Sequence, residues 1–138
     1  MQATLLNDVK VTVVKTTQST ATSAVNTDSV DMTGFDGVVF VGALATANAG
    51  NSVNLAQSSD NSTFVDLAGT AQVPGTSGDL VAIDLFRPSD RYVRAEIVRA
   101  GASTVTETFY AIQYRGRKSP ITSIATQETH VSPDEGTA

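Results

Sequence analysis

The sequence predicts an all-β protein, an antiparallel β-sandwich or jelly roll of about eight strands with an extended C-terminal arm. The first observation is composition: Thr, Ser and Val are abundant, whereas the 138 residues include only three Lys and four Glu. β-Branched side chains fit a pleated surface better than a helix. The second observation is periodicity, because apolar residues recur at alternate positions and never convincingly at helical spacing.

The first half of the chain contains two clear strand patterns. Val9, Val11 and Val13 alternate with polar residues, which predicts a strand with one buried face. The polar segment 16–29 has no clear period and indicates a long surface loop or a loosely attached edge segment. After turn signals at Gly34 and Asp36-Gly37, the run 38–44 is apolar on both faces, which is typical of a central strand.

The second half predicts a hairpin followed by three further strands. The polar cluster 58–62 separates two short β-type runs and indicates the hairpin. A mostly apolar strand over 80–86 should stop before Pro88, because proline cannot donate to a ladder. Strands over 92–97 and 104–114 follow, the latter predicted to be the longest. We therefore expect a domain over residues 1–118 and an extended arm over residues 119–138.

The composition excludes several classes of protein. Without Cys the chain has no disulfide, no thiolate nucleophile and no Cys-ligated zinc. An isoelectric point near 4.6 argues against nucleic-acid binding, which depends on neutralising phosphates. The N-terminal residues show no signal peptide, and the longest apolar stretch, 38–45, is far shorter than a bilayer span of about 20 residues. We expect neither a nucleic-acid nor a membrane partner.

No catalytic, cofactor or metal site is predicted. His130, the only histidine, lies in the predicted arm, which cannot hold a catalytic triad rigidly. The Asp60-Asn61-Ser62 cluster does not have the ligand spacing of an EF-hand, and turn formation explains its residue types. We therefore expect a protein that is not an enzyme.

Charge segregation is the feature that points to a partner. Seven of the nine basic residues lie between positions 87 and 118, whereas nine of the fourteen acidic residues precede position 91. Arginine is suited to bidentate carboxylate recognition and is enriched in interfaces. The candidate contact residues of this stretch are Arg91, Arg94, Arg115, Arg117 and Lys118. The alternative is that these side chains pair with the domain's own acidic groups.

The arm supplies a second set of candidate contacts. Residues 119–138 have no core of their own and gain order only by lying on another surface. The candidate anchors are Ile121, Ile124, His130 and Val131. The alternative is an unstructured tail.

Five segments, occurring in order, carry a family resemblance: Val30–Phe40 (VDMTGFDGVVF), Ser58–Phe64 (SSDNSTF), Arg91–Ala95 (RYVRA), Ala111–Tyr114 (AIQY) and Glu128–Pro133 (ETHVSP). Together they resemble the small cement, or decoration, proteins of tailed-bacteriophage heads. The resemblance implies a jelly-roll subunit on the capsid exterior that bridges major capsid proteins and reinforces the shell. It also implies a homo-oligomer, with a dimer favoured and a trimer possible, that is made in the cytoplasm of the host bacterium and then joins the virion.

Two other functions remain open at this point. A carbohydrate-binding jelly-roll module would use exposed aromatic platforms, usually Trp, and this chain has none. A head–tail joining or tail subunit would be compatible with the same composition.

Overall fold

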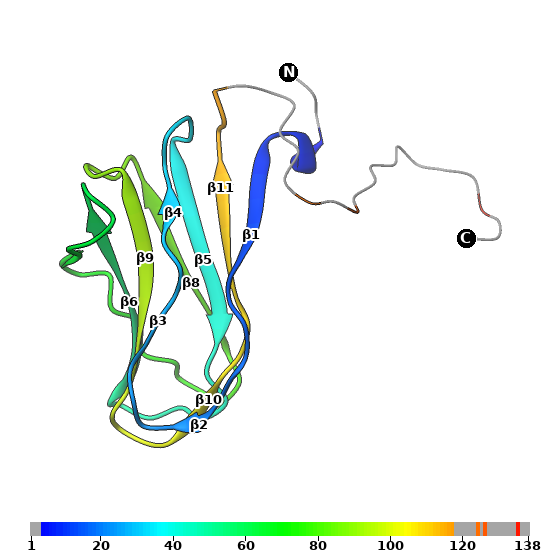
Figure 1. The fold of residues 1–138 in the computed structure, drawn as a ribbon. Coiled ribbons are helices and arrows are strands. Elements are labelled where there is room, and N and C mark those ends of the chain that lie inside the picture. Colours follow the sequence, from blue (N-terminus) through cyan, green and yellow to red (C-terminus); the bar gives the residue numbers. More distant parts are fainter. Residues whose placement is uncertain (1–3, 118–123, 125, 127–134, 136–138) are drawn as a thin grey trace.

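Two antiparallel sheets packed face to face form the fold (Figure 1). The computed structural model describes residues 4–117 together with residues 124, 126 and 135. The first sheet has the order β1-β11-β5-β8, with bounds β1 (Val9–Lys15), β11 (Phe109–Tyr114), β5 (Gly37–Ala43) and β8 (Leu80–Phe86). The second sheet has the order β3-β9-β6-β7, with bounds β3 (Val25–Asn26), β9 (Tyr92–Arg99), β6 (Asn51–Ser58) and β7 (Val65–Asp66).

Four short elements complete this framework. The strand β4 (Val30–Asp31) also pairs with β9, beyond the end of β3. The strands β2 (Gln18–Ala21) and β10 (Thr104–Thr106) pair with each other outside both sheets. A short 3-10 helix, η1 (Leu5–Asn7), precedes β1. No helix of the described residues has the length and hydrophobicity needed to span a membrane.

The order of the strands makes the fold a jelly roll. Along the chain, the first-sheet strands β1, β5, β8 and β11 are separated by excursions into the second sheet. If β3 and β4 are taken as one interrupted strand, each sheet has four strand positions. A jelly roll has eight strands in total, divided between two facing sheets and joined by Greek-key connections. The predicted antiparallel sandwich of the jelly-roll type is therefore confirmed, whereas most of the predicted arm over residues 119–138 lies outside the described residues.

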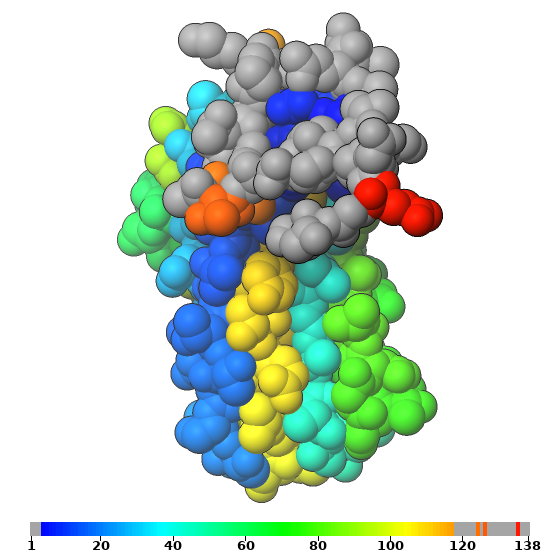
Figure 2. Space-filling model, turned by 90° about the vertical axis from the view of Figure 1, so that its right-hand side faces the viewer, coloured from blue at the N-terminus to red at the C-terminus, as the bar shows by residue number. Residues whose placement is uncertain are grey.

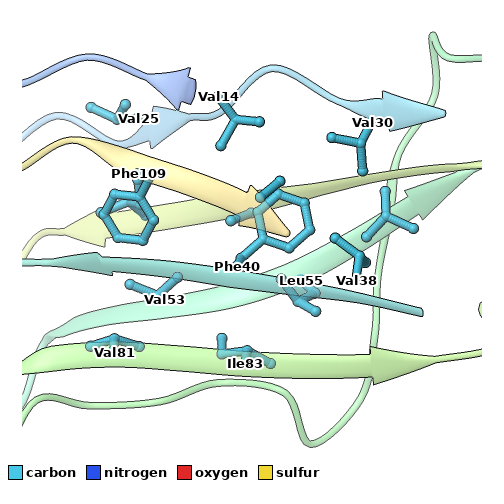
Figure 3. Packing of buried hydrophobic residues seen from close by; sticks show 14 of the residues in the cluster. Val14, Val25, Val30, Val38, Phe40, Val53, Leu55, Val81, Ile83 and Phe109 are labelled. Carbon is cyan, nitrogen blue, oxygen red and sulfur yellow. The ribbon is translucent and has the colours of Figure 1, made fainter. Parts of the chain in front are cut away.

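The core lies between the two sheets and is built from alternate residues of their strands. Phe40 and Phe109 project from the first sheet toward Val53 and Leu55 of the second (Figure 3), and all four are at most 1% exposed. Burial of such side chains contributes about 1.5–3 kcal/mol each. The alternation that predicted the strands is thus the pattern that fills the core.

Several local predictions are confirmed. β5 lies between β11 and β8, as expected for a central strand. β8 ends at Phe86, two residues before Pro88. β6 and β7 form the predicted hairpin, and the Asp60 carboxylate stabilises its turn by accepting the N–H groups of Ser62 and Thr63 at 2.9 and 3.0 Å.

Two local predictions are corrected and one is refined. The polar segment 16–29, predicted as a surface loop or an edge segment, contributes the short strands β2 and β3, and β3 lies at a sheet edge. The predicted longest strand, 104–114, is interrupted because its first part pairs with β2 and its second part with β1 and β5. In β1 a bulge between Val13 and Lys15 turns Val14 into the core, whereas Val13 stays 50% exposed. The valine alternation therefore did not identify the buried face.

Gly42 permits the close approach of a core ring, and this generates a prediction. A Cβ atom on Gly42 would lie 2.4 Å from Cδ2 of the fully buried Phe109. We expect Gly42→Ala to lower the free energy of unfolding by about 1–3 kcal/mol, the usual effect of overpacking a core. Chemical denaturation measures this value. Gly75→Ala is the matched control, because a Cβ there meets nothing within 4 Å; equal effects of the two substitutions would contradict the prediction.

Candidate interaction surface

Four arginines meet at one end of the sandwich, drawn uppermost in Figure 1. β8 and β11 both pair antiparallel with β5, so both finish beside the start of β5. Arg87 follows β8, and Arg115 and Arg117 follow β11. Arg91 precedes β9, which starts at this end because its first residue, Tyr92, pairs with Asp31 of β4. The topology therefore brings together residues that are up to 30 positions apart.

The loop between β4 and β5 holds this end together, and we call residues 32–36 the hub loop. The N–H of Arg87 donates to the carbonyl of Asp36 at 2.7 Å, and the N–H of Arg117 donates to the carbonyl of Gly34 at 2.8 Å. The N–H of Met32 donates to the carbonyl of Arg91 at 2.8 Å. The backbones of Arg87, Arg91 and Arg117 are therefore all hydrogen-bonded to this loop. Gly34 has a φ of +87°, a conformation that favours glycine.

Two of the arginines have a left-handed backbone. Arg87 and Arg115 each have a φ of 52°, which is uncommon for residues with a Cβ atom. Their guanidinium groups lie 5.0 and 5.8 Å from the centroid of the Phe86 ring, within the range of a cation–π contact. A strained backbone conformation is kept only where the surrounding structure enforces it, and such conformations cluster at functional sites.

Two adjoining grooves flank the hub loop. The first, which we call the arginine groove, has a volume of about 570 Å³ and is lined by residues that include Met32, Phe35, Arg87, Arg91 and Arg117. The second has a volume of about 580 Å³, and its lining includes Leu5, Val9, Tyr114 and Arg115. Asp36 and Arg117 line both grooves. This end is therefore concave, with guanidinium groups beside apolar side chains.

Arg91 makes the strongest ion pair of this end. Its Nε and Nη2 atoms donate to Oδ1 and Oδ2 of Asp31 at 3.0 and 2.7 Å, a bidentate geometry. The hydrogen bond from Arg91 holds the pKa of the Asp31 carboxyl well below its usual range, and the backbone N–H of Thr33 acts in the same direction. The same hydrogen bond raises the pKa of Arg91.

The other three guanidinium groups are less well satisfied. Arg115 and Arg117 share the Asp36 carboxylate at 3.7 and 3.8 Å, well beyond the 2.7–2.9 Å of a charge-assisted hydrogen bond. Arg87 makes no ion pair within the described residues. This arrangement leaves guanidinium N–H groups that can donate hydrogen bonds to carboxylates of a partner.

The structure unites some of the sequence-predicted contact residues and separates others. Arg91, Arg115 and Arg117 lie together, whereas Arg94 is on the outer face of the second sheet, paired with Glu96 and 4.0 Å from the Phe64 ring centroid. Ile124 is half-buried. The remaining predicted contacts lie outside the described residues: Lys118, Ile121, His130 and Val131. They stay predictions.

The sequence reasoning missed two members of this surface. Arg87 belonged to the basic stretch but was not selected as a contact, and its position directly after a strand and before Pro88 was the available signal. Asp36 was assigned to a turn, yet its carboxylate also lies between Arg115 and Arg117. The described part of the chain contains no group of three or more His, Asp or Glu side chains placed to hold a metal ion.

Comparison with known proteins gives a likeness of fold alone. No protein-family model matches the chain, and no curated protein matches it. Among solved structures, the PBSX exported protein XepA is similar over 91% of this chain and 43% of its own, with 19% identity and a TM-score of 0.53. The SPBc2 prophage-derived protein YomS is similar over 77% of this chain and 92% of its own, with 12% identity and a TM-score of 0.49. The chain thus spans less than half the length of XepA.

The ion pair between Arg91 and Asp31 predicts a pH-dependent contribution to stability. A carboxyl whose pKa is lowered by folding stabilises the protein above its unfolded pKa, and this stabilisation is lost as the pH falls through the folded pKa. We expect Asp31→Asn to lower the free energy of unfolding near neutral pH, and the deficit to shrink as the pH falls below about 4. Denaturation at several pH values measures the deficit. A deficit that stays constant down to about pH 2 would contradict this. Asp28→Asn is the control, since Asp28 has no ion pair among the described residues.

The left-handed conformation of Arg87 predicts different effects of two substitutions. Both Arg87→Gly and Arg87→Ala remove the guanidinium group, but only glycine also relieves the backbone. We expect the glycine variant to be more stable than the alanine variant by about 1 kcal/mol. Thermal and chemical unfolding compare the two. Equal stabilities would show that the backbone of Arg87 is not strained.

Proposed function

We propose that this chain is a structural virion protein of a tailed bacteriophage that binds the outside of the capsid and cements neighbouring major capsid proteins. The proposal combines the resemblance of five sequence segments to head decoration proteins with the chemistry of the arginine groove. In this proposal the chain is made in the cytoplasm of the host bacterium and functions on the exterior of the virion. The prophage origin of YomS belongs to that protein, and the phage origin of this chain is part of the proposal.

The observation that carries the proposal is the position of the arginine groove. Arg117 lines the groove and is followed directly by residues 118–138, the segment predicted to be an arm. Four arginines of the basic stretch, and the last described residue before the predicted arm, therefore lie at the same end of the sandwich. A single partner surface can engage both.

The chemistry of the groove suits an acidic protein surface. Arg87 has no acidic partner in the described part of the chain, and Arg117 is only loosely paired with Asp36 at 3.8 Å. A partner carboxylate can replace this weak pairing at little cost, whereas the bidentate Arg91 would have to give up strong bonds. Modest contacts of this kind become strong when they are repeated over a lattice, because linked binding events reinforce one another.

The test is binding to purified phage heads that lack the chain. We expect the protein to co-sediment with the heads at a fixed ratio to the major capsid protein, and to appear on their outer surface by electron cryo-microscopy. Arg87→Gly and Arg117→Gln should each weaken binding by about tenfold, because each removes one guanidinium contact. Higher salt should also weaken binding, because it screens exposed charges. Arg94→Gln is the matched control, since Arg94 lies on the outer face of the second sheet.

Other outcomes of this experiment would contradict the proposal. Equal weakening by the Arg94 variant would show that the groove is not the contact. Failure to bind heads, together with a saccharide-dependent rise in melting temperature, would favour a carbohydrate-binding module. Rings of six-fold or twelve-fold symmetry would favour a head–tail joining or tail subunit. If removal of the residues after Ser119 left head binding unchanged, the predicted role of the arm would be wrong.

A further inference from the structure

The outer face of the first sheet is unusually apolar. Paired residues of neighbouring strands project on the same side of a sheet, so each register row shows which side chains share a face. One row across the four strands is Val13, Tyr110, Val41 and Ala82. The members of this row alternate with buried residues and so face away from the core. Figure 2 views this face, with β11 in yellow, β5 in cyan and β8 in green.

The next row includes Asp84, the only charged residue in these two rows. It consists of Val11, Ile112, Val39 and Asp84. The hydroxyl of Tyr114 donates to Oδ1 of Asp84 at 2.6 Å, and burial, together with this hydrogen bond, raises the pKa of Tyr114 to about 12. The carboxylate therefore has a neutral, hydrogen-bonded partner within the face.

The outer face of the second sheet is different. There the Arg94–Glu96 ion pair lies beside Asn54, whose side-chain amide donates to Asp66 at 3.2 Å. The first sheet instead exposes large apolar side chains, with Leu80 at 76% and Val13 at 50%. The apolar character is therefore particular to one side of the molecule, as at a binding surface.

The flat area of this face is about half of the area that a stable dimer buries on each partner. Four strands spaced by about 4.8 Å, with roughly seven residues each at about 3.3 Å, give a flat area of roughly 450 Å². Side chains and rim residues enlarge the accessible area beyond this projection. A stable interface buries about 800 Å² on each partner, and contiguous apolar patches of more than a few hundred Å² are rare on monomers.

The charges at the two ends of the face indicate how a second copy would lie. The guanidinium of Arg115 lies over the Phe86 ring at the end of β8, and Asp79 is exposed just before Leu80 at the start of β8. If the two-fold axis lies in the interface and runs across the strands, the end of β8 in one copy faces its start in the other. Arg115 then meets Asp79. An axis along the strands would instead bring the two copies of Arg115 to the same end.

We propose that the outer face of the β1-β11-β5-β8 sheet binds a second copy of this chain, in a two-fold dimer whose facing strands run antiparallel. The apolar rows pack against each other, and Arg115 of each copy pairs with Asp79 of the other. The dimer does not depend on the proposed capsid function, because the arginine groove takes no part in it.

Sedimentation of the full chain tests this proposal. We expect a species of twice the chain mass of 14.3 kDa at micromolar concentration. Leu80→Glu and Tyr110→Glu should weaken the dimer at least about tenfold, because each places a charge in the apolar interface. Val65→Glu is the matched control: Val65 is 64% exposed but lies on β7 of the other sheet. Circular dichroism and thermal melting confirm that each variant is folded.

Charge reversal tests the orientation. Arg115→Glu and Asp79→Arg should each weaken the dimer, and the double variant should recover most of the wild-type affinity because the pair is restored with opposite polarity. If the wild-type protein is monomeric at about 100 µM, the proposal is wrong. Coverage of the face by residues 118–138 of the same copy would give this outcome. A dimer insensitive to both face variants would overturn the proposal equally. Absence of recovery in the double variant would overturn the antiparallel arrangement.

Discussion

The pairing of β5 with β11 on one side and β8 on the other is the constraint on which the rest of the structure depends. Antiparallel pairing with a common central strand makes β8 and β11 run in the same direction, so that both end beside Gly37. The residues that follow these strands must therefore meet. The meeting of the arginines at one end of the sandwich is therefore a consequence of sheet topology. The hub loop then anchors the backbones of Arg87, Arg91 and Arg117.

The same central strand shapes the outer face. A Cβ atom on Gly37 would lie 2.2 Å from Cζ of Tyr114, so the absence of a side chain there lets the Tyr114 ring lie over β5 and reach Asp84 on β8. Through this contact, the Tyr114 hydroxyl supplies the Asp84 carboxylate with a hydrogen-bond donor. A larger residue at position 37 would displace the ring and leave a charge without a partner on an otherwise apolar surface.

Local patterns predicted the strands well and the sites only in part. The alternation of Val53 and Leu55, the turn cluster around Asp60 and the stop before Pro88 are local signals, and the structure agrees with each. The bulge at Val14 depends on the register with β11, which no local pattern contains. Local alternation places Arg94 on the outer face of β9, whereas Arg91 precedes the strand. That Arg91 lies beside Arg87 and Arg117 depends on the sheet pairing, which no local pattern contains.

The two proposed surfaces are compatible because one lies at the end of the sandwich and the other on its side. In the antiparallel dimer, the arginine grooves of the two copies point in opposite directions along the strands, separated by at least the strand length of roughly 25 Å. Each groove is followed by its own residues 118–138. Under the proposed function, such a dimer would offer one groove to each of two shell subunits, whereas a monomer has one groove. The proposed dimer would then bridge the two subunits through avidity, without either groove having to bind tightly.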